Sequence, residues 1–226
     1  MFDGGSCAIL KEKAVVYVKN ILLIGDSIRI GYDKAVKESL QGRANVYFPG
    51  ENCRFACYVL RYLHEYKQLV PEGKVDILHW NAGLWDCLRL FGEDPQTPIE
   101  VYAHYIDRIC VRIGKLFPGA KVIFATSTAV LSEQMDADFK RYNPEIEAYN
   151  AAAVEVVKRY GFTVNDLYTV SAGLPEGAHS DPVHYYTPLG TEAFTKQVLT
   201  YLTEAAGWEE VPQYREVIHC DSPIGI

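Results

Sequence analysis

The sequence lacks the features that typify membrane-spanning, secreted and nucleic-acid-binding proteins. No apolar run approaches the roughly 20 residues that a bilayer-spanning helix needs, and the first residues lack the charged-then-apolar order of a secretory signal. The formal net charge is −7, and the longest basic cluster, from Lys11 to Lys13, is interrupted by Glu12. Because phosphate binding requires a basic stripe, we expect no nucleic-acid partner. The missing apolar run and secretory signal lead us to expect no membrane association and a cytoplasmic location.

The cysteine and histidine patterns of metal or disulfide frameworks are also missing. The six histidines include no H-E-x-x-H or other ligand spacing, so we expect no metal site and no cofactor. No two cysteines form a C-x-x-C pair. The six cysteines lie in segments of different kinds: Cys7, Cys53, Cys57, Cys87, Cys110 and Cys220. This distribution favours buried free thiols over disulfides or a zinc framework.

Length and composition predict one α/β domain. The chain has 226 residues, of which 49% are apolar and 23% charged, an ordinary globular composition. We expect a single domain over residues 1–226, with a core at about 20–206 and a C-terminal extension at 207–226. Trp208, Tyr214, Val217 and Ile218 in this extension indicate that it packs on the domain or on a second subunit, and the second case would make the protein a homo-oligomer.

Short apolar runs alternate with longer helical patterns, which is typical of parallel βαβ units. The expected strands are Asn20 to Gly25, Asn45 to Phe48, Val75 to Trp80, Lys121 to Thr126 and Phe162 to Asn165. The expected helices are Ile30 to Gln41, Arg54 to Gln68, Ile99 to Lys115, Pro144 to Tyr160 and Pro188 to Ala206. Right-handed crossovers then cover both faces of the sheet with helices. The sequence predicts a doubly wound, flavodoxin-like three-layer α/β/α fold with a mainly parallel five-stranded sheet.

Helix ends carry their own signals. Asn143 and Thr187, each followed by proline, are expected N-caps, and Gly161 is expected to end the fourth helix. The two long loops, Ala82 to Pro98 and Ser127 to Tyr142, follow strands. They should therefore lie at the carboxyl edge of the sheet, where ligands bind in open α/β folds.

Four polar segments are expected to meet at this same edge: "GDSIRIG", "FPGENCR", "HWNAGLWD" and "SDPVHYYTPLG". They contain Ser27 after the first strand, Gly50 after the second, Asn81 after the third, and Asp181 with His184 before the last helix. A serine hydroxyl needs an adjacent base to become a nucleophile, and His184 is the candidate. Asp181, three residues earlier, is placed to orient the imidazole and stabilise its cation.

These four segments resemble the SGNH hydrolases, also called the GDSL esterase and lipase family, over about Ile21 to Leu202. The resemblance implies a catalytic triad of Ser27, Asp181 and His184. It also implies an oxyanion hole formed by the backbone N–H groups of Ser27 and Gly50 and the side-chain amide of Asn81. At Gly50, a close backbone approach or unusual backbone angles would explain the glycine.

The third segment departs from the family pattern Gly-x-Asn-Asp, because here it reads His79-Trp80-Asn81-Ala82. The support of Asn81 is therefore in question. Asp86 is an alternative support, although a surface-loop role is favoured. The G-x-S-x-G elbow of the α/β-hydrolases is absent from the sequence, which argues against that superfamily.

Four residues that flank the catalytic segments are candidate substrate-binding residues: Arg29, Glu51, Asn52 and Trp85. For Arg29, a structural pair with Glu51 is favoured over binding a substrate carboxylate. Trp85 is balanced between stacking on a sugar and anchoring its loop. His79 is favoured as a core histidine, and Tyr185 and Tyr186 are candidates to line the pocket.

The sequence thus predicts a cofactor-independent serine esterase that acts on a small-molecule acyl ester. Short acyl groups, such as acetyl on a carbohydrate, are favoured because no long apolar segment suggests a lipid-binding lid. The alternatives are a lysophospholipase or thioesterase of the same fold, and a non-catalytic binding module on that scaffold. A flavodoxin-like redox protein is disfavoured because no phosphate-cradling loop follows the first strand.

Overall fold

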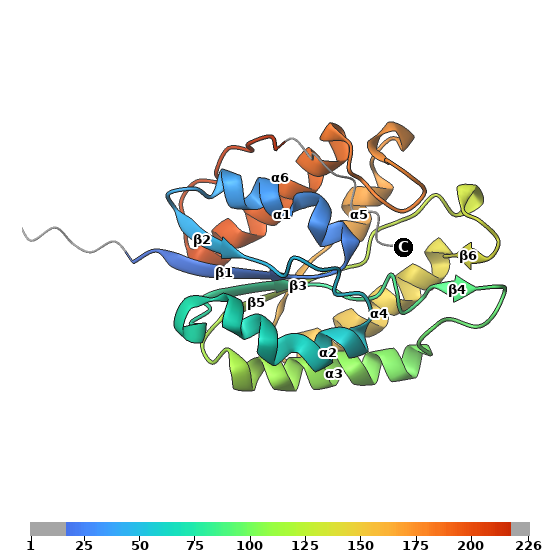
Figure 1. Cartoon of the computed structure of the whole chain (residues 1–226), viewed down its shortest axis with the longest axis horizontal. Helices are drawn as coiled ribbons and strands as arrows, with labels where there is room; N and C mark the ends of the chain where they lie inside the picture. The colour runs from blue at the N-terminus through green and yellow to red at the C-terminus, as the bar shows by residue number, and fades with distance from the viewer. Residues whose placement is uncertain (1–16, 218–226) are drawn as a thin grey trace, which may run out of the picture.

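The computed structural model describes residues 17–217, in which a five-stranded parallel sheet is enclosed by helices (Figure 1). In spatial order the strands are β2 (Ala44–Tyr47), β1 (Lys19–Ile24), β3 (Ile77–Trp80), β5 (Lys121–Ala125) and β7 (Thr163–Asn165). From β1 the chain first moves to β2 at one edge and then crosses back to β3 on the other side. The switch point therefore lies between β1 and β3, where ligands bind in open α/β folds.

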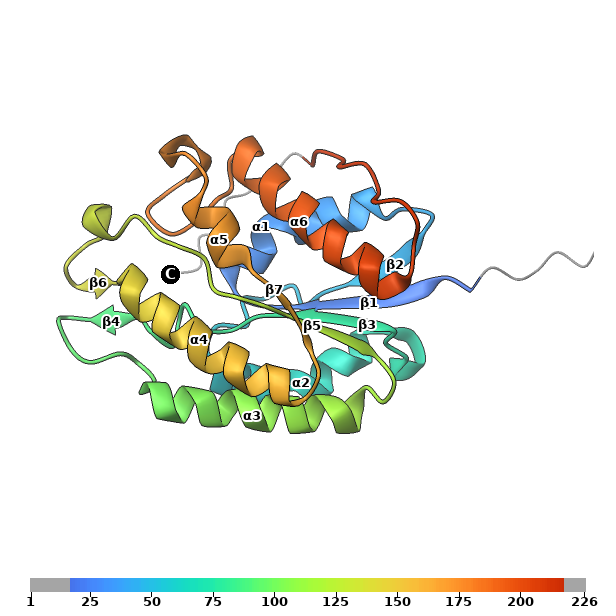
Figure 2. The same cartoon turned by 180° about the vertical axis from the view of Figure 1, so that it is seen from behind.

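The helices form one layer on each face of the sheet, as Figures 1 and 2 show. The α-helices are α1 (Ser27–Ser39), α2 (Ala56–Tyr66), α3 (Ile99–Leu116), α4 (Asn143–Arg159), α5 (Leu167–Ala172) and α6 (Pro188–Ala206). Four 3-10 turns complete the description: Lys67–Leu69, Pro71–Gly73, Ser132–Gln134 and Glu176–Ala178. Helices α1, α5 and α6 pack on one face, and α2, α3 and α4 pack on the other. This architecture confirms the predicted fold class.

Burial on both faces explains why the central strands are almost continuously apolar. The four side chains of "ILLI" in β1 are fully buried, as is the Phe124 ring of β5. On the helices, apolar residues recur at helical spacing and face the sheet. In α3 the buried positions are Tyr102, Ile106, Ile109, Cys110 and Ile113. All five predicted strands and all five predicted helices are present.

Two of the three predicted helix-end signals are confirmed. Thr187 caps α6 by accepting a hydrogen bond from the backbone N–H of Gly190 at 3.1 Å. Gly161 follows the last turn of α4 with a φ of +70°, a conformation that glycine adopts without strain. The cap predicted at Asn143 is wrong. Its side chain instead forms two hydrogen bonds to the backbone of Val130, each 2.9 Å long, and so ties the loop after β5 to α4.

The two long loops lie at the carboxyl edge as predicted, but they also pair with each other. β4 (Arg89–Leu90) and β6 (Phe139–Lys140) form a two-stranded antiparallel ribbon beyond the ends of the main strands (Figure 1). Arg89 joins the ribbon to α4 through an ion pair with Glu145 at 2.7 Å. The six-residue helix α5 was also not predicted. Both elements depend on contacts between distant segments, which periodicity alone does not reveal.

The described part of the C-terminal extension packs on its own chain. The Arg43 guanidinium lies over the Trp208 ring, 4.8 Å from its centroid, and the Arg215 backbone N–H donates to the Ser39 hydroxyl at 2.9 Å. Ile218 lies outside the described residues. The predicted oligomer stays a prediction, as does the single-domain boundary at residues 1–226.

Four cysteines fall within the described residues, and all are free thiols. Cys53, Cys87 and Cys110 are buried, whereas Cys57 is exposed on α2. Cys7 and Cys220 lie outside the described residues.

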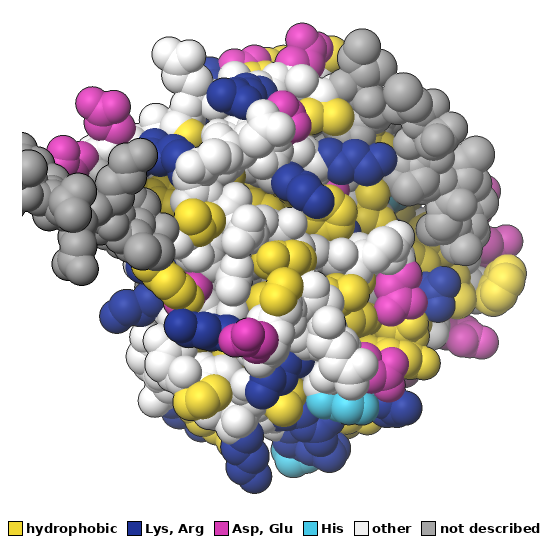
Figure 3. Space-filling view, turned by 60° about the vertical axis from the view of Figure 1, so that its left-hand side comes forward, with side chains coloured by type: hydrophobic (Ala, Val, Ile, Leu, Met, Phe, Trp, Pro, Cys, Tyr) yellow, Lys and Arg dark blue, Asp and Glu magenta, His cyan; other side chains and the backbone are white. Residues whose placement is uncertain are grey.

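On the face seen in Figure 3, acidic and basic side chains are interspersed over most of the surface. The absence of a nucleic-acid partner stays a prediction.

Candidate active site

Ser27 lies just beyond the carboxyl end of β1, where the chain enters α1. Asp26 is the N-cap of this helix and accepts a hydrogen bond from the backbone N–H of Ile28 at 3.0 Å. Ser27 is therefore the first helical residue of α1. Because Asp26 performs the capping, the hydroxyl of Ser27 is available to line a pocket.

His184 and Asp181 approach this serine from the loop that precedes α6. The Nε2 atom of His184 lies 2.8 Å from Ser27 Oγ, and its Nδ1 atom lies 2.7 Å from Asp181 Oδ2. The other carboxylate oxygen accepts from the backbone N–H of Val183 at 2.8 Å and of His184 at 2.9 Å. A tight turn thus fixes the carboxylate beside the imidazole, as the three-residue spacing predicted.

These contacts determine the charge of Asp181. Partial burial alone would raise the pKa of this carboxyl, but the hydrogen bonds from the His184 ring and from the two backbone N–H groups lower the pKa to about 2. Asp181 is therefore ionised at neutral pH. An ionised carboxylate at Nδ1 keeps the proton on that nitrogen and leaves Nε2 as the acceptor that faces Ser27.

Tyr186 supports the imidazole from behind, a role that the sequence did not reveal. Its ring stacks on the His184 ring, with centroids 4.8 Å apart and planes 17° apart. Its hydroxyl donates to the backbone carbonyl of Ser27 at 2.8 Å. A Cβ on Gly31 of α1 would lie 2.8 Å from the Tyr186 ring. The glycine therefore makes room for the ring that holds His184. Tyr185, in contrast, is buried and donates to the carbonyl of Ala129 at 2.8 Å.

Asn81 follows β3 and lies beside Gly25 and Asp26 at the switch point. Its backbone N–H donates to the carbonyl of Ile24 at 3.1 Å, which continues the pairing of β1 with β3. Its side chain packs so closely over Gly25 that a Cβ there would lie 1.9 Å from Asn81 Oδ1. Burial raises the pKa of Asp26, and the side-chain amide of Asn81 opposes this rise by hydrogen bonding. Gly25 and Asp26 thus hold Asn81 in place of the missing family residues.

Gly50 lies on the exposed loop after β2, and Arg29 fixes this loop from below. The Arg29 guanidinium donates to the carbonyls of Pro49 at 2.9 Å and Glu51 at 2.5 Å, the residues on either side of Gly50. Gly50 does not have a positive φ. A Cβ at Gly50 would meet no atom within 4 Å. The expected close approach and left-handed backbone are therefore wrong, and the space around Gly50 is open.

The four candidate substrate-binding residues have different environments. Arg29 is only 1% exposed and pairs with the Asp33 carboxylate, so its structural role holds but with Asp33 in place of the Glu51 carboxylate. The Glu51 carboxylate accepts from the hydroxyls of Tyr58 and Tyr66. The Asn52 side chain accepts from the backbone N–H of Arg54 at 2.9 Å. These three residues do not line the pocket described below, and a substrate role for them is not supported.

Asp86 is fully buried, so the surface-loop role favoured for it is wrong. Its carboxylate accepts from the backbone N–H of Ala56 at 3.0 Å, at the first turn of α2. The residue at the N-cap position of this helix, Phe55, provides no side-chain cap, and Asp86 supplies the missing acceptor. Burial raises the pKa of Asp86 to about 7, against the hydrogen bond from Ala56.

His79 is a core histidine, as favoured. It is fully buried on β3, its Nε2 atom lies 3.2 Å from Asn165 Nδ2, and its ring meets the edge of Tyr32. Burial lowers the pKa of His79 to about 3. A neutral side chain without access to the pocket excludes it as a catalytic base.

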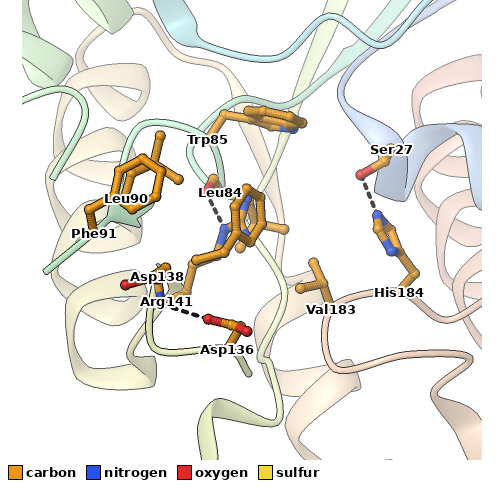
Figure 4. A pocket seen from close by; sticks show the side chains of 11 residues that line it. Ser27, Leu84, Trp85, Leu90, Phe91, Asp136, Asp138, Arg141, Val183 and His184 are labelled. Carbon is orange, nitrogen blue, oxygen red and sulfur yellow. Dashed lines mark hydrogen bonds between the residues drawn. The ribbon is translucent and has the colours of Figure 1, made fainter. Parts of the chain in front are cut away.

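A largely apolar pocket of about 660 Å³ opens beside the serine and histidine. In Figure 4, Ser27 and His184 lie on one side of the pocket, Leu90 and Phe91 on the opposite side, and Trp85 and Arg141 between them. The lining residues are Ser27, Leu84, Trp85, Leu90, Phe91, Asp136, Asp138, Phe139, Arg141, Val183 and His184. Trp85 is the only one of the four candidate substrate-binding residues among them. The loops and ribbon that supply the other walls carried no motif in the sequence.

Among residues 17–217, no group of three or more His, Cys, Asp or Glu side chains is arranged to hold a metal ion. Within the same range, no helix has the length and apolar character needed to cross a membrane. The Ser27 hydroxyl and the His184 imidazole line the pocket, and the Asp181 carboxylate continues the hydrogen-bonded series behind them. This arrangement can transfer a proton from Ser27 Oγ to His184 while Asp181 balances the resulting charge.

Comparisons with known proteins give a match at the level of structure. No family model and no curated protein matches the sequence. A lipase/acylhydrolase from Enterococcus faecalis superposes with a TM-score of 0.67 at 18% identity, covering 88% of this chain and 100% of that one. A GDSL-like lipase from Bacteroides thetaiotaomicron gives 0.66 at 15% identity, with 83% and 89% covered.

A third solved structure, an acetyl-xylooligosaccharide esterase from Geobacillus, has a TM-score of 0.63 at 14% identity and covers 86% of this chain and 97% of that one. The chain therefore has the fold of the GDSL-type SGNH hydrolases, as the resemblance of its four sequence segments predicted.

Proposed function

We propose that this protein is a serine esterase that hydrolyses carboxylic esters through an acyl-serine intermediate. The observation that carries the proposal is the continuous hydrogen-bonded series from Ser27 Oγ to His184 Nε2 at 2.8 Å and from His184 Nδ1 to Asp181 Oδ2 at 2.7 Å. The series ends at an ionised carboxylate and begins at a pocket wall. Nucleophile, base and orienting group are thus within the reach that acyl transfer needs.

In the first half of the reaction, Ser27 Oγ attacks the ester carbonyl carbon while its proton moves to His184 Nε2. The carbonyl π electrons move onto oxygen, and the imidazolium that forms is stabilised by Asp181. When the tetrahedral intermediate collapses, the bond to the alcohol oxygen breaks and His184 returns the proton to that oxygen. The products of this half are the free alcohol and an acyl group on Ser27.

The oxyanion of the intermediate needs hydrogen-bond donors, each contributing roughly 2.7–4 kcal/mol to the transition state. The backbone N–H of Ser27 is one of the first four of α1, which have no partner within the helix. The backbone N–H of Gly50 and the Nδ2 of Asn81 complete the proposed set. Arg29 and Gly25 act as positioning residues for Gly50 and Asn81, respectively.

Hydrolysis of the acyl-serine repeats the same steps with water. His184 Nε2 removes one proton from water, the hydroxide oxygen bonds to the acyl carbon, and the bond to Ser27 Oγ breaks as His184 returns the proton to it. The carboxylic acid leaves and the enzyme is regenerated. No oxidant, reductant or metal is consumed in this balance.

The dimensions of the pocket favour an ester larger than an acetate. The expectation of a short acyl group depended on the absence of an apolar lid, but Leu90 and Phe91 form an apolar wall across the pocket from Ser27 (Figure 4). Phe139 of the ribbon also lines the pocket. An acetylated sugar would leave this wall in contact with water or polar hydroxyls. The apolar wall instead supports an ester with an extended apolar group, while Trp85 remains available for stacking.

Replacement of Ser27 tests the proposal. Ser27→Ala should abolish hydrolysis of p-nitrophenyl acetate, butyrate and hexanoate and should prevent labelling by a fluorophosphonate, with peptide mapping placing the label on Ser27 in the parent. Ser39→Ala is the matched control, because Ser39 is a buried serine at the far end of the same helix. Retained hydrolysis in Ser27→Ala would contradict the proposal, and ligand-induced thermal stabilisation without labelling would favour a non-catalytic binding module.

A further inference from the structure

Arg141 is a buried cation in the wall of the pocket and has little to neutralise it. It is 2% exposed, and its Nε donates to the backbone carbonyl of Leu84 at 2.5 Å. Its Nη1 atom is buried and has no hydrogen-bond partner among the described residues. Within residues 17–217, no carboxylate lies within ion-pair distance of this guanidinium, although Asp26 and Asp181 act on it electrostatically from further away.

Arg29, the other buried arginine near the site, is neutralised within the protein. Arg29 pairs with the Asp33 carboxylate and donates to the carbonyls of Gly25, Pro49 and Glu51, which leaves only its Nε unpaired. Removing a charge from water is costly unless it is paired and hydrogen-bonded. Arg29 meets that condition within the protein, and Arg141 does not.

Two aromatic rings hold the Arg141 guanidinium in place. It lies 5.1 Å from the ring centroid of Phe139 and 5.9 Å from that of Trp85, and both rings also line the pocket. Such contacts are weaker than an ion pair, but with the hydrogen bond to Leu84 they fix the orientation of the planar group. A preorganised guanidinium is suited to a planar carboxylate, which it binds through two parallel hydrogen bonds.

The remaining walls define what separates such an anion from the reacting ester. Between Ser27 and Arg141 the pocket is bounded mainly by Leu84, Trp85 and Val183 (Figure 4). Asp136 and Asp138 also line the pocket, but they are exposed, so solvent screens their charge. The repulsion that remains from these two carboxylates disfavours a dianion more than a monoanion. A carboxylate therefore fits better than a phosphate monoester.

We propose that Arg141 determines specificity by binding a carboxylate of the ester substrate, so that the preferred substrate is a monoanionic ester with an apolar segment between ester and carboxylate. The proposal rests on the esterase function proposed above. The carboxylate belongs either to the acyl part, as in a dicarboxylic acid monoester, or to the alcohol part, as in the ester of a hydroxy acid. In both cases a carboxylate binds Arg141, and esters that carry the carboxylate on only one of the two parts distinguish the cases.

The test compares charged and neutral esters of matched size, after subtraction of spontaneous hydrolysis. For the acyl part the pair is p-nitrophenyl hemiglutarate and p-nitrophenyl valerate, and for the alcohol part it is 4-acetoxybenzoate and phenyl acetate. In the parent, the charged ester should have a higher kcat/KM than its neutral partner in one of the two pairs, which identifies the part of the substrate that carries the carboxylate. Arg141→Met should lower that kcat/KM about 10- to 100-fold, mainly through KM, the size expected when a hydrogen bond to a charged group is lost.

The controls separate recognition from folding. The neutral esters should change less than threefold in Arg141→Met, and Arg141→Lys should recover part of the preference because it keeps the charge. Arg61→Met removes the same charge from the exposed surface of α2 and should leave the ratio of charged to neutral rates unchanged. An equal loss on charged and neutral esters would assign Arg141 a purely structural role and overturn the proposal.

A measurement on the parent protein keeps the test valid if Arg141→Met does not fold. Hexanoate should inhibit hydrolysis of p-nitrophenyl valerate competitively, at a concentration at least tenfold lower than hexanamide, and equal inhibition would contradict the proposal. If no ester is hydrolysed and Ser27 is not labelled, the esterase proposal fails. Calorimetric binding of hexanoate against hexanamide then still decides the role of Arg141 by itself.

Discussion

Arg29 and Asp33, one turn apart on α1, form a buried ion pair whose remaining hydrogen bonds hold the loop around Gly50. The pair links the helix that begins with the proposed nucleophile, Ser27, to a proposed oxyanion donor, Gly50. Arg29 is 1% exposed and Asp33 is 2% exposed, so solvent does not screen the pair. The position of Gly50 therefore depends on an interaction inside the protein.

Arg29→Met should leave Asp33 as an uncompensated buried charge and lower the free energy of unfolding by about 3–5 kcal/mol. Urea denaturation measures this loss. Because the Gly50 loop is then released, kcat for p-nitrophenyl butyrate should fall as well. The double variant Arg29→Met/Asp33→Leu should recover most of the stability but not kcat. Recovery of both would show that the loop does not need Arg29.

Asp181→Asn should lower kcat by about 10³- to 10⁴-fold, as expected when the group that orients a catalytic histidine loses its charge. The lowered pKa of about 2 means that Asp181 stays ionised through the usual assay range. Titration of Asp181 should therefore cause no change in kcat/KM between pH 5 and 9. Asp166→Asn, which alters the cap of α5, is the matched control. An Asp181→Asn variant that keeps the kcat of the parent would refute the assignment.

Asp86 should make the protein less stable as pH rises. Its folded-state pKa of about 7 lies above the ordinary value of 3.8, so between these values the folded state binds the proton more tightly than the unfolded state does. Stability should fall across this range, by up to about 4 kcal/mol. Asp86→Asn should remove this fall, as urea denaturation at pH 5 and pH 7.5 would reveal.

Because His79 also changes stability with pH, the stability at pH 5 and pH 7.5 has to be compared between the parent and the Asp86→Asn variant. Its pKa of about 3 lies below the ordinary value of 6.5, so its contribution to stability rises with pH over that range and opposes that of Asp86. Subtracting the Asp86→Asn profile from the parent profile isolates the Asp86 contribution. Asp136→Asn, at an exposed position, should leave the profile unchanged. A difference profile without slope would show that Asp86 is ionised in the folded protein.

Gly31→Ala should displace the Tyr186 ring, because the new Cβ would lie 2.8 Å from it. Overpacking of this kind costs about 1–3 kcal/mol. Since the same ring stacks on His184, kcat should fall about tenfold or more, in line with the sensitivity of catalysis to small displacements. Gly114→Ala is the matched control, because a Cβ at this helical position meets no atom within 4 Å. It should stabilise α3 by about 0.5–1 kcal/mol and leave kcat unchanged.

The strands and long helices were predictable because burial on both faces of a parallel sheet leaves a local signature. "ILLI" in β1 and "KVIFAT" around β5 are such signatures. The meeting of Ser27, Asp181 and His184 was also predictable, since Ser27 follows the end of β1 and the other two lie in the loop that leads into α6. The local sequence was enough to predict a feature wherever the contacts that determine it join residues close together in the chain.

The remaining features depend on contacts between distant segments. Asp86 caps a helix that begins 30 residues before it, and Asn143 bonds to Val130 instead of its own helix. Arg141 lies in a loop without periodicity, and its burial follows from Phe139 and Trp85 on paired segments. Sequence spacing carries no information on these partners, so the pocket walls could not be predicted along with the triad.

The β4–β6 ribbon separates two properties of the molecule. The proposed nucleophile, Ser27, directly follows the central strand β1, whereas the opposite pocket wall is carried by a small unit built from two connecting loops. With this arrangement, substitutions in the two loops can change the pocket wall without altering the positions of Ser27 and His184. Transplanting residues 84–97 together with 132–142 into a homologous scaffold should carry the substrate preference with them.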